Sequence, residues 1–141
     1  MNIKKTANLL LNFAIKRLAE IFGIIIFVSG LMLIIALSSY SPEDPNFIFP
    51  ENTQIKNLLG FKGSFVSDLF FQSVGLIAYP ISFTFMFTGI NIFRNKDFFL
   101  IIENTLFTIM YCVFGTLFFS HFYSNIFTFY INGNGGFVGS Y

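Results

Sequence analysis

Three long apolar stretches, residues 21–40, 69–92 and 98–119, constrain this chain more than any other feature of its sequence. Each stretch contains roughly 20 residues, and an α-helix of that length crosses a hydrocarbon core about 30 Å thick. Hydrophobic residues make up 55% of the chain and charged residues 11%, whereas about a quarter of the residues in a soluble domain are charged. The sequence therefore predicts an all-α, polytopic membrane protein with three transmembrane helices.

Basic residues indicate which side of the membrane each helix end occupies. Lys16 and Arg17 precede the first stretch, and Arg94 and Lys96 fall in the short connection between the second and third. Short cytoplasmic loops retain lysine and arginine, so we expect both pairs on the cytoplasmic side. The connection after the first stretch has more acidic than basic residues, as a translocated loop does. We therefore expect a multi-pass protein of the cytoplasmic membrane with its N-terminus inside.

The apolar stretches also divide the chain into regions. Residues 1–20 mix basic and apolar side chains, which is typical of an interfacial helix that leads into a membrane span. Residues 21–119 form the transmembrane domain, with an external loop at 41–65, and residues 120–141 form an external, glycine-rich tail. Gly135 and Gly139 have the spacing of a close-packing helix motif, so another helix is expected to begin in the tail near Tyr141.

A cleaved signal peptide is the alternative interpretation of the first stretch. Ala36 and Ser38 resemble the small-residue pattern of a cleavage site. The apolar region of a signal peptide has about 7 to 15 residues, however, and this stretch is longer. A retained transmembrane helix is therefore favoured.

Pro80 lies near the middle of the second stretch. A proline ring removes one backbone hydrogen bond and commonly bends a helix, so we expect a kink there. Gly75 and Ala78 are small residues just before it, and we expect them to allow close contact between helices.

Enzymatic chemistry has little support in this sequence. Cys112 is the single cysteine and His121 the single histidine, so neither a metal-ligand set nor a nucleophile with its base can be assembled. The segment 60–64 has neither the spacing nor the Lys-Ser/Thr pair of a phosphate-binding loop. We therefore expect no enzyme activity, no cofactor and no metal.

Several segments, taken in order, resemble the N-terminal membrane domain of the FtsK/SpoIIIE DNA translocases. They are residues 37–45 (LSSYSPEDP), 57–64 (NLLGFKGS), 67–72 (SDLFFQ), 75–80 (GLIAYP) and 135–139 (GGFVG). Phe47 stands where that family often has tryptophan. The residues that carry the resemblance and the expected packing are Tyr40, Ser41, Pro42, Asp44, Pro45, Gly60, Gly63, Asp68, Gly75, Tyr79, Pro80, Gly135, Gly136 and Gly139.

The resemblance implies a membrane anchor for a hexameric, ATP-driven DNA pump at the bacterial division septum, with a role in cell division and chromosome segregation. Its expected partners are the lipid bilayer, other division membrane proteins and further copies of itself. The resemblance also implies that the glycine-rich tail leads toward a fourth membrane helix that is missing from these residues, and that the motor of the family follows that helix. ATP hydrolysis and direct nucleic-acid binding are therefore not expected of residues 1–141. The external loop is expected to offer a docking surface.

A small transporter or channel subunit is the alternative function. Glu103 and Asn104 lie within the third stretch, and an ionisable group inside a membrane is often functional. Glu103 is close to the cytoplasmic end, however, where the positive end of the helix dipole favours a carboxylate. A boundary or helix-contact role is therefore the preferred interpretation of Glu103.

Overall fold

The computed structural model describes residues 3–45, 54–123 and 132–140, and every regular element in these ranges is helical. The elements are α1 (Ile3–Ser38), α2 (Gly60–Val74), the short 3-10 helix η1 (Gly75–Ile77), α3 (Ala78–Asn95), α4 (Phe99–Phe122) and α5 (Gly136–Ser140). Three segments of the described chain are long and apolar enough to cross a membrane, Ala7–Ser38, Gly60–Asn95 and Phe99–Phe122. The predicted all-α membrane fold with three spanning segments is therefore confirmed.

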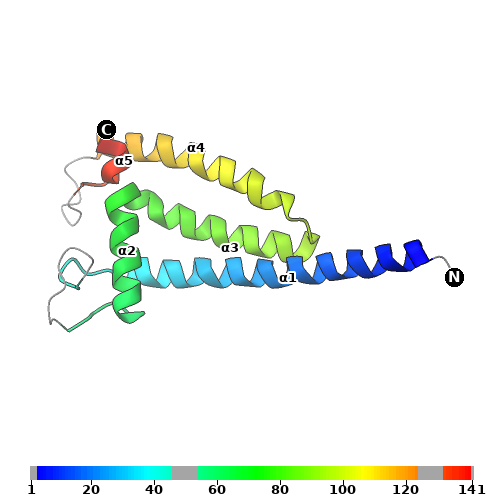
Figure 1. Ribbon diagram of the computed structural model, residues 1–141. Coiled ribbons are helices and arrows are strands. Elements are labelled where there is room, and N and C mark those ends of the chain that lie inside the picture. Colours follow the sequence, from blue (N-terminus) through cyan, green and yellow to red (C-terminus); the bar gives the residue numbers. More distant parts are fainter. Residues whose placement is uncertain (1–2, 46–53, 124–131, 141) are drawn as a thin grey trace.

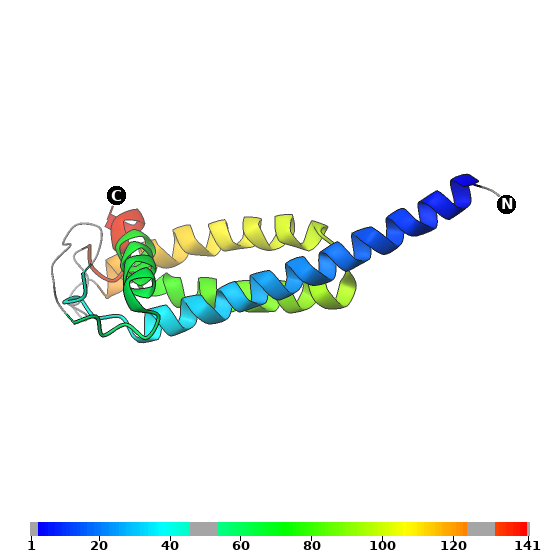
Figure 2. The ribbon, with the colours of Figure 1, turned by 60° about the horizontal axis from the view of Figure 1, so that its bottom comes forward.

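Helices α1, α3 and α4 run lengthwise beside one another, and α2 lies across one end of them (Figure 1). The short α5 packs beside α2 and α4 at this same end. The N-terminal part of α1 extends past the other helices at the opposite end, near the α3–α4 turn (Figure 2). We call the end with α2 and α5 the loop end and the other the turn end.

The most extensive contact between helices joins α1 to α3, and it depends on glycine. A Cβ atom on Gly23 would lie 2.7 Å from the Gly89 carbonyl oxygen, and one on Gly89 would lie 2.5 Å from the Phe27 backbone nitrogen. A Cβ on Gly30 would lie 2.8 Å from backbone atoms of Ser82 and Met86. The backbones approach this closely because no side chain separates them, as is usual where membrane helices associate.

Helix α4 presents apolar side chains on nearly its whole circumference. Thr116 is its one buried residue, while Phe107, Phe114 and Phe122 are at least 60% exposed. A helix that is hydrophobic all round belongs in lipid or in the core of a large protein, so these side chains are consistent with a hydrocarbon solvent.

The sequence predicted that the second apolar stretch is a single helix with a kink at Pro80, and this prediction is wrong. The chain turns at Gly75–Ile77, so residues 69–74 belong to the transverse α2 and the lengthwise part begins at Ala78. Gly75 has a φ of +58°, which a residue with a side chain rarely adopts. Pro80 is in the first turn of α3, where a backbone N–H has no partner within the helix, so the proline costs it no hydrogen bond.

Helix α1 is continuous from the basic N-terminal region into the apolar stretch. Its 36 residues give a length of about 54 Å, nearly twice the thickness of a hydrocarbon core. Residues 3–20 therefore extend the first span as the same helix, in line with the expectation that they lead into it. Their placement at the membrane surface stays a prediction.

Candidate functional site at the loop end

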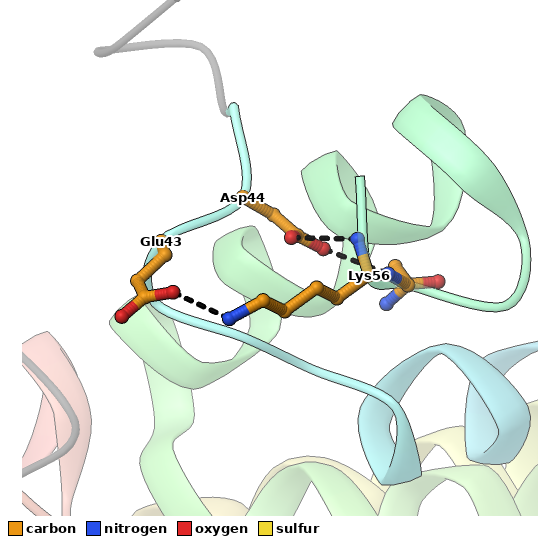
Figure 3. Close-up of polar contacts among 4 residues, drawn as sticks. Glu43, Asp44 and Lys56 are labelled. Atoms are coloured by element: carbon orange, nitrogen blue, oxygen red, sulfur yellow. Dashed lines mark hydrogen bonds and ion pairs between the residues drawn. The ribbon is translucent and has the colours of Figure 1, made fainter. Parts of the chain in front are cut away.

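The loop that leaves α1 is fixed by a turn and by one buried carboxylate. The Asp44 backbone N–H donates to the Ser41 carbonyl oxygen at 3.2 Å, which closes a turn with Pro42 in its second position. The Asp44 side chain is 3% exposed, and its Oδ1 and Oδ2 accept hydrogen bonds from the backbone N–H groups of Lys56 and Asn57, both at 2.8 Å (Figure 3). Asp44 thereby joins the start of the loop to its end.

A second contact between the two ends of the loop lies at the surface. The Lys56 ammonium donates to Glu43 Oε2 at 2.5 Å, and both side chains are more than 60% exposed (Figure 3). The ammonium group lowers the pKa of Glu43, and the carboxylate raises the pKa of Lys56. Exposed ion pairs of this kind stabilise little, so the buried Asp44 contacts hold the loop more strongly.

Asn57 is the centre of the polar contacts beneath the loop. Its side chain is 4% exposed, and Nδ2 donates to the carbonyl oxygen of Ala36 at 2.9 Å. Its Oδ1 accepts from the Leu59 backbone N–H at 3.0 Å, an Asx turn that leads into α2. A Cβ on Gly63 would lie 2.1 Å from Asn57 Oδ1, so glycine is required there for the amide to fit.

The first turns of α2 continue this network. Ser64 Oγ donates to the Pro45 carbonyl oxygen at 3.0 Å, and both residues are buried. Ser67 is completely buried and donates to the Ser64 carbonyl oxygen at 3.0 Å. Buried polar groups are stable only when they have hydrogen-bond partners, and these hydroxyls have them.

Two tyrosines join the network to the ends of α1 and α3. Tyr40 donates its hydroxyl to Asp68 Oδ1 at 3.2 Å, and Tyr79 donates to the Leu37 carbonyl oxygen at 3.3 Å. The ring of Phe71, 1% exposed, lies between them, with centroid distances of 4.9 Å to Tyr40 and 5.7 Å to Tyr79. We call the residues from Tyr40 to Tyr79 that make these contacts the loop-end cluster.

The C-terminal segment crosses the turn between α2 and α3. The Leu76 backbone N–H donates to the Asn134 carbonyl oxygen at 3.0 Å, and a Cβ on Gly75 would lie 1.9 Å from that oxygen. Gly136 has a φ of +61°, and a Cβ atom on it would lie 2.6 Å from the Gly75 backbone nitrogen. The backbone of the tail therefore rests directly on Gly75.

The start of α5 packs on α4 through small residues. Cβ atoms on Gly135 and Gly139 would lie 2.4 and 2.5 Å from the Thr116 carbonyl oxygen. The same positions lie 2.9 and 3.1 Å from Ser120 Cβ. Gly135 and Gly139, four residues apart, thus lie against Thr116 and Ser120, which are also four residues apart on α4.

The turn end carries the basic residues that the sequence analysis assigned to the cytoplasmic side. It also carries Glu20, which the sequence analysis did not select. Glu20 forms ion pairs with Arg17 at 2.5 Å and with Lys96 at 2.8 Å, and so joins α1 to the α3–α4 turn. Lys96 caps α3 in the left-handed conformation, with a φ of +57°. The spacing of Arg17 and Glu20 was the available signal, but their contact with Lys96 depends on the tertiary fold.

Most of the residues selected from the sequence meet at the loop end. The structure brings together Tyr40, Ser41, Asp44, Pro45, Gly63, Asp68, Gly75 and Tyr79 with the tail glycines Gly135, Gly136 and Gly139. Gly60 has open space around its Cβ position, and Pro42 and Pro80 are exposed. Asn57, Ser64 and Ser67 were missed as individual residues, although they lie within the segments that carry the resemblance.

The loop-end cluster joins the end of α1, the two described ends of the loop and the start of α2 through hydrogen bonds. No group of three or more His, Cys, Asp or Glu side chains that suits a metal ion occurs among the described residues. Both oxygens of Asp44 and one of Asp68 accept hydrogen bonds. These contacts are therefore suited to holding the ends of the loop against α1 and α2.

Glu103 and Asn104 occupy different surroundings on α4. Glu103 is exposed on the outer side of the bundle. Asn104 Nδ2 donates to Thr88 Oγ1 on α3 at 2.7 Å, within a groove of about 230 Å³ between α1, α3 and α4. Thr84 and Tyr111 join the same two helices by a hydroxyl contact of 2.8 Å. Asn104 therefore contributes to helix association.

The lengthwise helices, the transverse α2 and the apolar exterior define a polytopic helical membrane domain. Residues 15–141 match the family model described as the 4TM region of DNA translocase FtsK/SpoIIIE, and the chain belongs to this family.

Similar proteins named DNA translocase FtsK occur in several bacteria. The protein from Azospirillum brasilense is 32% identical over 107 residues, which cover 74% of this chain and 16% of that protein. Those from Rickettsia typhi and Caulobacter vibrioides are 30% and 33% identical over 55% and 56% of this chain, and over 10% of each relative. The chain thus matches only a small part of the length of these relatives. No solved structure matches it.

Proposed function

We propose that this chain is the membrane anchor and interaction region of an FtsK-type DNA translocase that acts in cell division and chromosome segregation. The observation that supports this most is the match of residues 15–141 to the membrane region of that family, in a chain with three membrane-spanning segments. The residues of this chain are proposed to contribute no motor activity and no direct DNA binding. Purified chain that hydrolyses ATP or retards a DNA duplex in a gel would contradict this.

The proposed location is the cytoplasmic membrane of a bacterium, with the turn end inside. The argument is that Lys96 pairs with Glu20 beside Arg17, so the basic residues of two separate segments gather at one end of the bundle. Basic residues in short segments remain in the cytoplasm. A reporter enzyme that is active only outside the cytoplasm should be inactive when fused after Lys96 and active when fused within 54–58. The reverse pattern would exclude this orientation.

The loop end is proposed to dock other division membrane proteins, and the bundle to associate with further copies of itself. The support is that Asp44 and Asn57 join the two described ends of the loop, residues 41–45 and 54–59, to each other and to the end of α1. A fluorescent fusion of the chain should gather at the septum of dividing bacteria. Asp44→Ala should reduce that signal at equal membrane abundance, while Glu43→Ala, which removes an exposed carboxylate beside it, should not. An even distribution of the parent fusion around the cell would count against the proposal.

Transport remains the second candidate, and one observation favours it. The groove between α1, α3 and α4 is lined partly by polar side chains, namely Ser29, Thr84, Thr88, Asn104, Thr105 and Thr108. Transport paths for ions and protons generally use ionisable groups, and the residues lining this groove include none. Proteoliposomes containing the chain should therefore show no ion flux, and Glu103→Gln should change nothing. A flux that this substitution abolishes would favour transport over anchoring.

A further inference from the structure

The transverse helix α2 forms a groove with α1 at the loop end. The groove has a volume of about 340 Å³, and it is lined by Ser29, Met32, Leu33 and Ala36 of α1 and by Leu59, Lys62, Gly63 and Val66 at the start of α2. Ser29 and Ala36 are seven residues apart, which corresponds to about 10 Å along the helix axis. The groove therefore runs from the loop end into the depth that acyl chains occupy.

Apolar side chains of α2 also point outward beside this groove. Leu58, just before the helix, is 77% exposed, Phe61 is 49% exposed and Leu69 is 53% exposed. A helix that lies across a membrane bundle with such side chains exposed is suited to the boundary between headgroups and hydrocarbon. The groove thus opens where lipid is the neighbouring molecule.

The one charged residue that lines the groove is Lys62. Lys62 is exposed and forms no ion pair among the described residues, whereas Lys56 and Lys96 are paired with carboxylates. No side chain caps the N-terminus of α2, two residues before Lys62, so the partial positive charge of the helix end adds to that of the ammonium group. A cation at the mouth of an apolar groove complements a molecule with an anionic head and a hydrocarbon tail.

We propose that this groove binds an anionic phospholipid of the leaflet at the loop end. The phosphate pairs with the Lys62 ammonium, and one acyl chain lies between α1 and α2 against Met32, Leu33 and Val66. Lysine stems commonly extend along apolar surfaces while the charged group reaches the headgroup layer. The bound lipid would fill the groove between α1 and α2 and stabilise the packing of α2 against α1. The inference does not depend on the division partners proposed above.

The test is native mass spectrometry of the purified chain released from mixed nanodiscs of phosphatidylglycerol and phosphatidylcholine. The parent chain should retain phosphatidylglycerol preferentially. Lys62→Gln should reduce that preference about fivefold, as expected for one lysine near a lipid surface. Lys56→Gln is the matched control, because Lys56 lies at the same end but is already paired with Glu43, and it should leave the preference unchanged.

A second variant tests the hydrocarbon part of the site. Val66→Trp places a large side chain in the groove, so it should reduce retention of both lipids while Lys62 is intact. Helix content by circular dichroism verifies that each variant is folded. Equal loss of preference in Lys62→Gln and Lys56→Gln would show a diffuse charge effect and overturn the site. Unchanged retention in folded Lys62→Gln and Val66→Trp would overturn it as well.

Discussion

Replacement of Asp44 by alanine should open the loop at the end of α1. The two carboxylate oxygens of Asp44 accept backbone N–H groups of Lys56 and Asn57 at 2.8 Å, and the side chain is 3% exposed. A buried donor left without an acceptor costs about 1–3 kcal/mol, and the partly buried Lys56 amide belongs at the low end of that range, so the substitution should destabilise the closed loop by about 2–4 kcal/mol. Asp44→Asn should have an intermediate effect, because its single carbonyl oxygen cannot accept both bonds in the same way.

Hydrogen exchange measured by mass spectrometry on the chain in nanodiscs gives the magnitude directly. A factor of ten in exchange corresponds to about 1.4 kcal/mol, so the amides of Lys56 and Asn57 should exchange at least about 30-fold faster in Asp44→Ala. Glu43→Ala is the matched control, since it removes the neighbouring carboxylate, whose side chain is 75% exposed and pairs with Lys56 at the surface. Equal protection of these amides in both variants would refute the assignment of Asp44 as the residue that closes the loop.

Three further predictions concern helix packing, the position of the tail and one ion pair. Gly89→Ala should destabilise the bundle by about 1–3 kcal/mol in thermal unfolding, because its Cβ would meet only backbone atoms of α1. Gly115→Ala, whose Cβ would meet only the flexible end of one side chain, should be much milder, and equal melting temperatures would contradict the close α1–α3 contact. Gly75→Ala should detach the tail from the α2–α3 turn, seen as loss of a disulfide between cysteines placed at 76 and 134, and full cross-linking would show that the turn tolerates a side chain. Glu20→Gln should speed tryptic cleavage after Lys96 by releasing that lysine from its ion pair, and an unchanged rate would show that the pair does not hold the turn.

The spanning segments were predictable because they depend on local composition. Residues 21–38, 78–92 and 99–119 are apolar in sequence and helical in the structure, and lipid imposes this outcome on almost any chain of that kind. The end of the first helix near Pro42 was predictable for the same local reason.

The turn at Gly75 was not predictable from hydropathy, because the residues on both sides of it are apolar. Its signal is the backbone conformation that glycine allows, and the cause lies in the crossing of Asn134, far along the chain. We predicted a kink at Pro80 because the hydropathy pattern places this residue inside a longer helix. In the structure Pro80 lies in the first turn of α3, where a proline does not disturb the helix.

The sequence contains a pattern that indicates the close glycine contact of α1 with α3. Gly23 and Gly30 are seven residues apart, as are Ser82 and Gly89. This spacing places each pair on one helix face, but only the fold shows that the two faces meet. The buried role of Asn57 likewise depends on Ala36 and Gly63, which sequence distance does not bring together.

The crossing of the tail over Gly75 has a consequence for the order of assembly. Bacterial ribosomes add about 5–20 residues per second, so Asn134 is made roughly 3–12 seconds after Gly75. During that interval the bend between α2 and α3 lacks the carbonyl that accepts the Leu76 amide. The second apolar stretch is thus able to enter the bilayer before its bend is fixed, and the transverse arrangement of α2 is completed only once Asn134 has been translated.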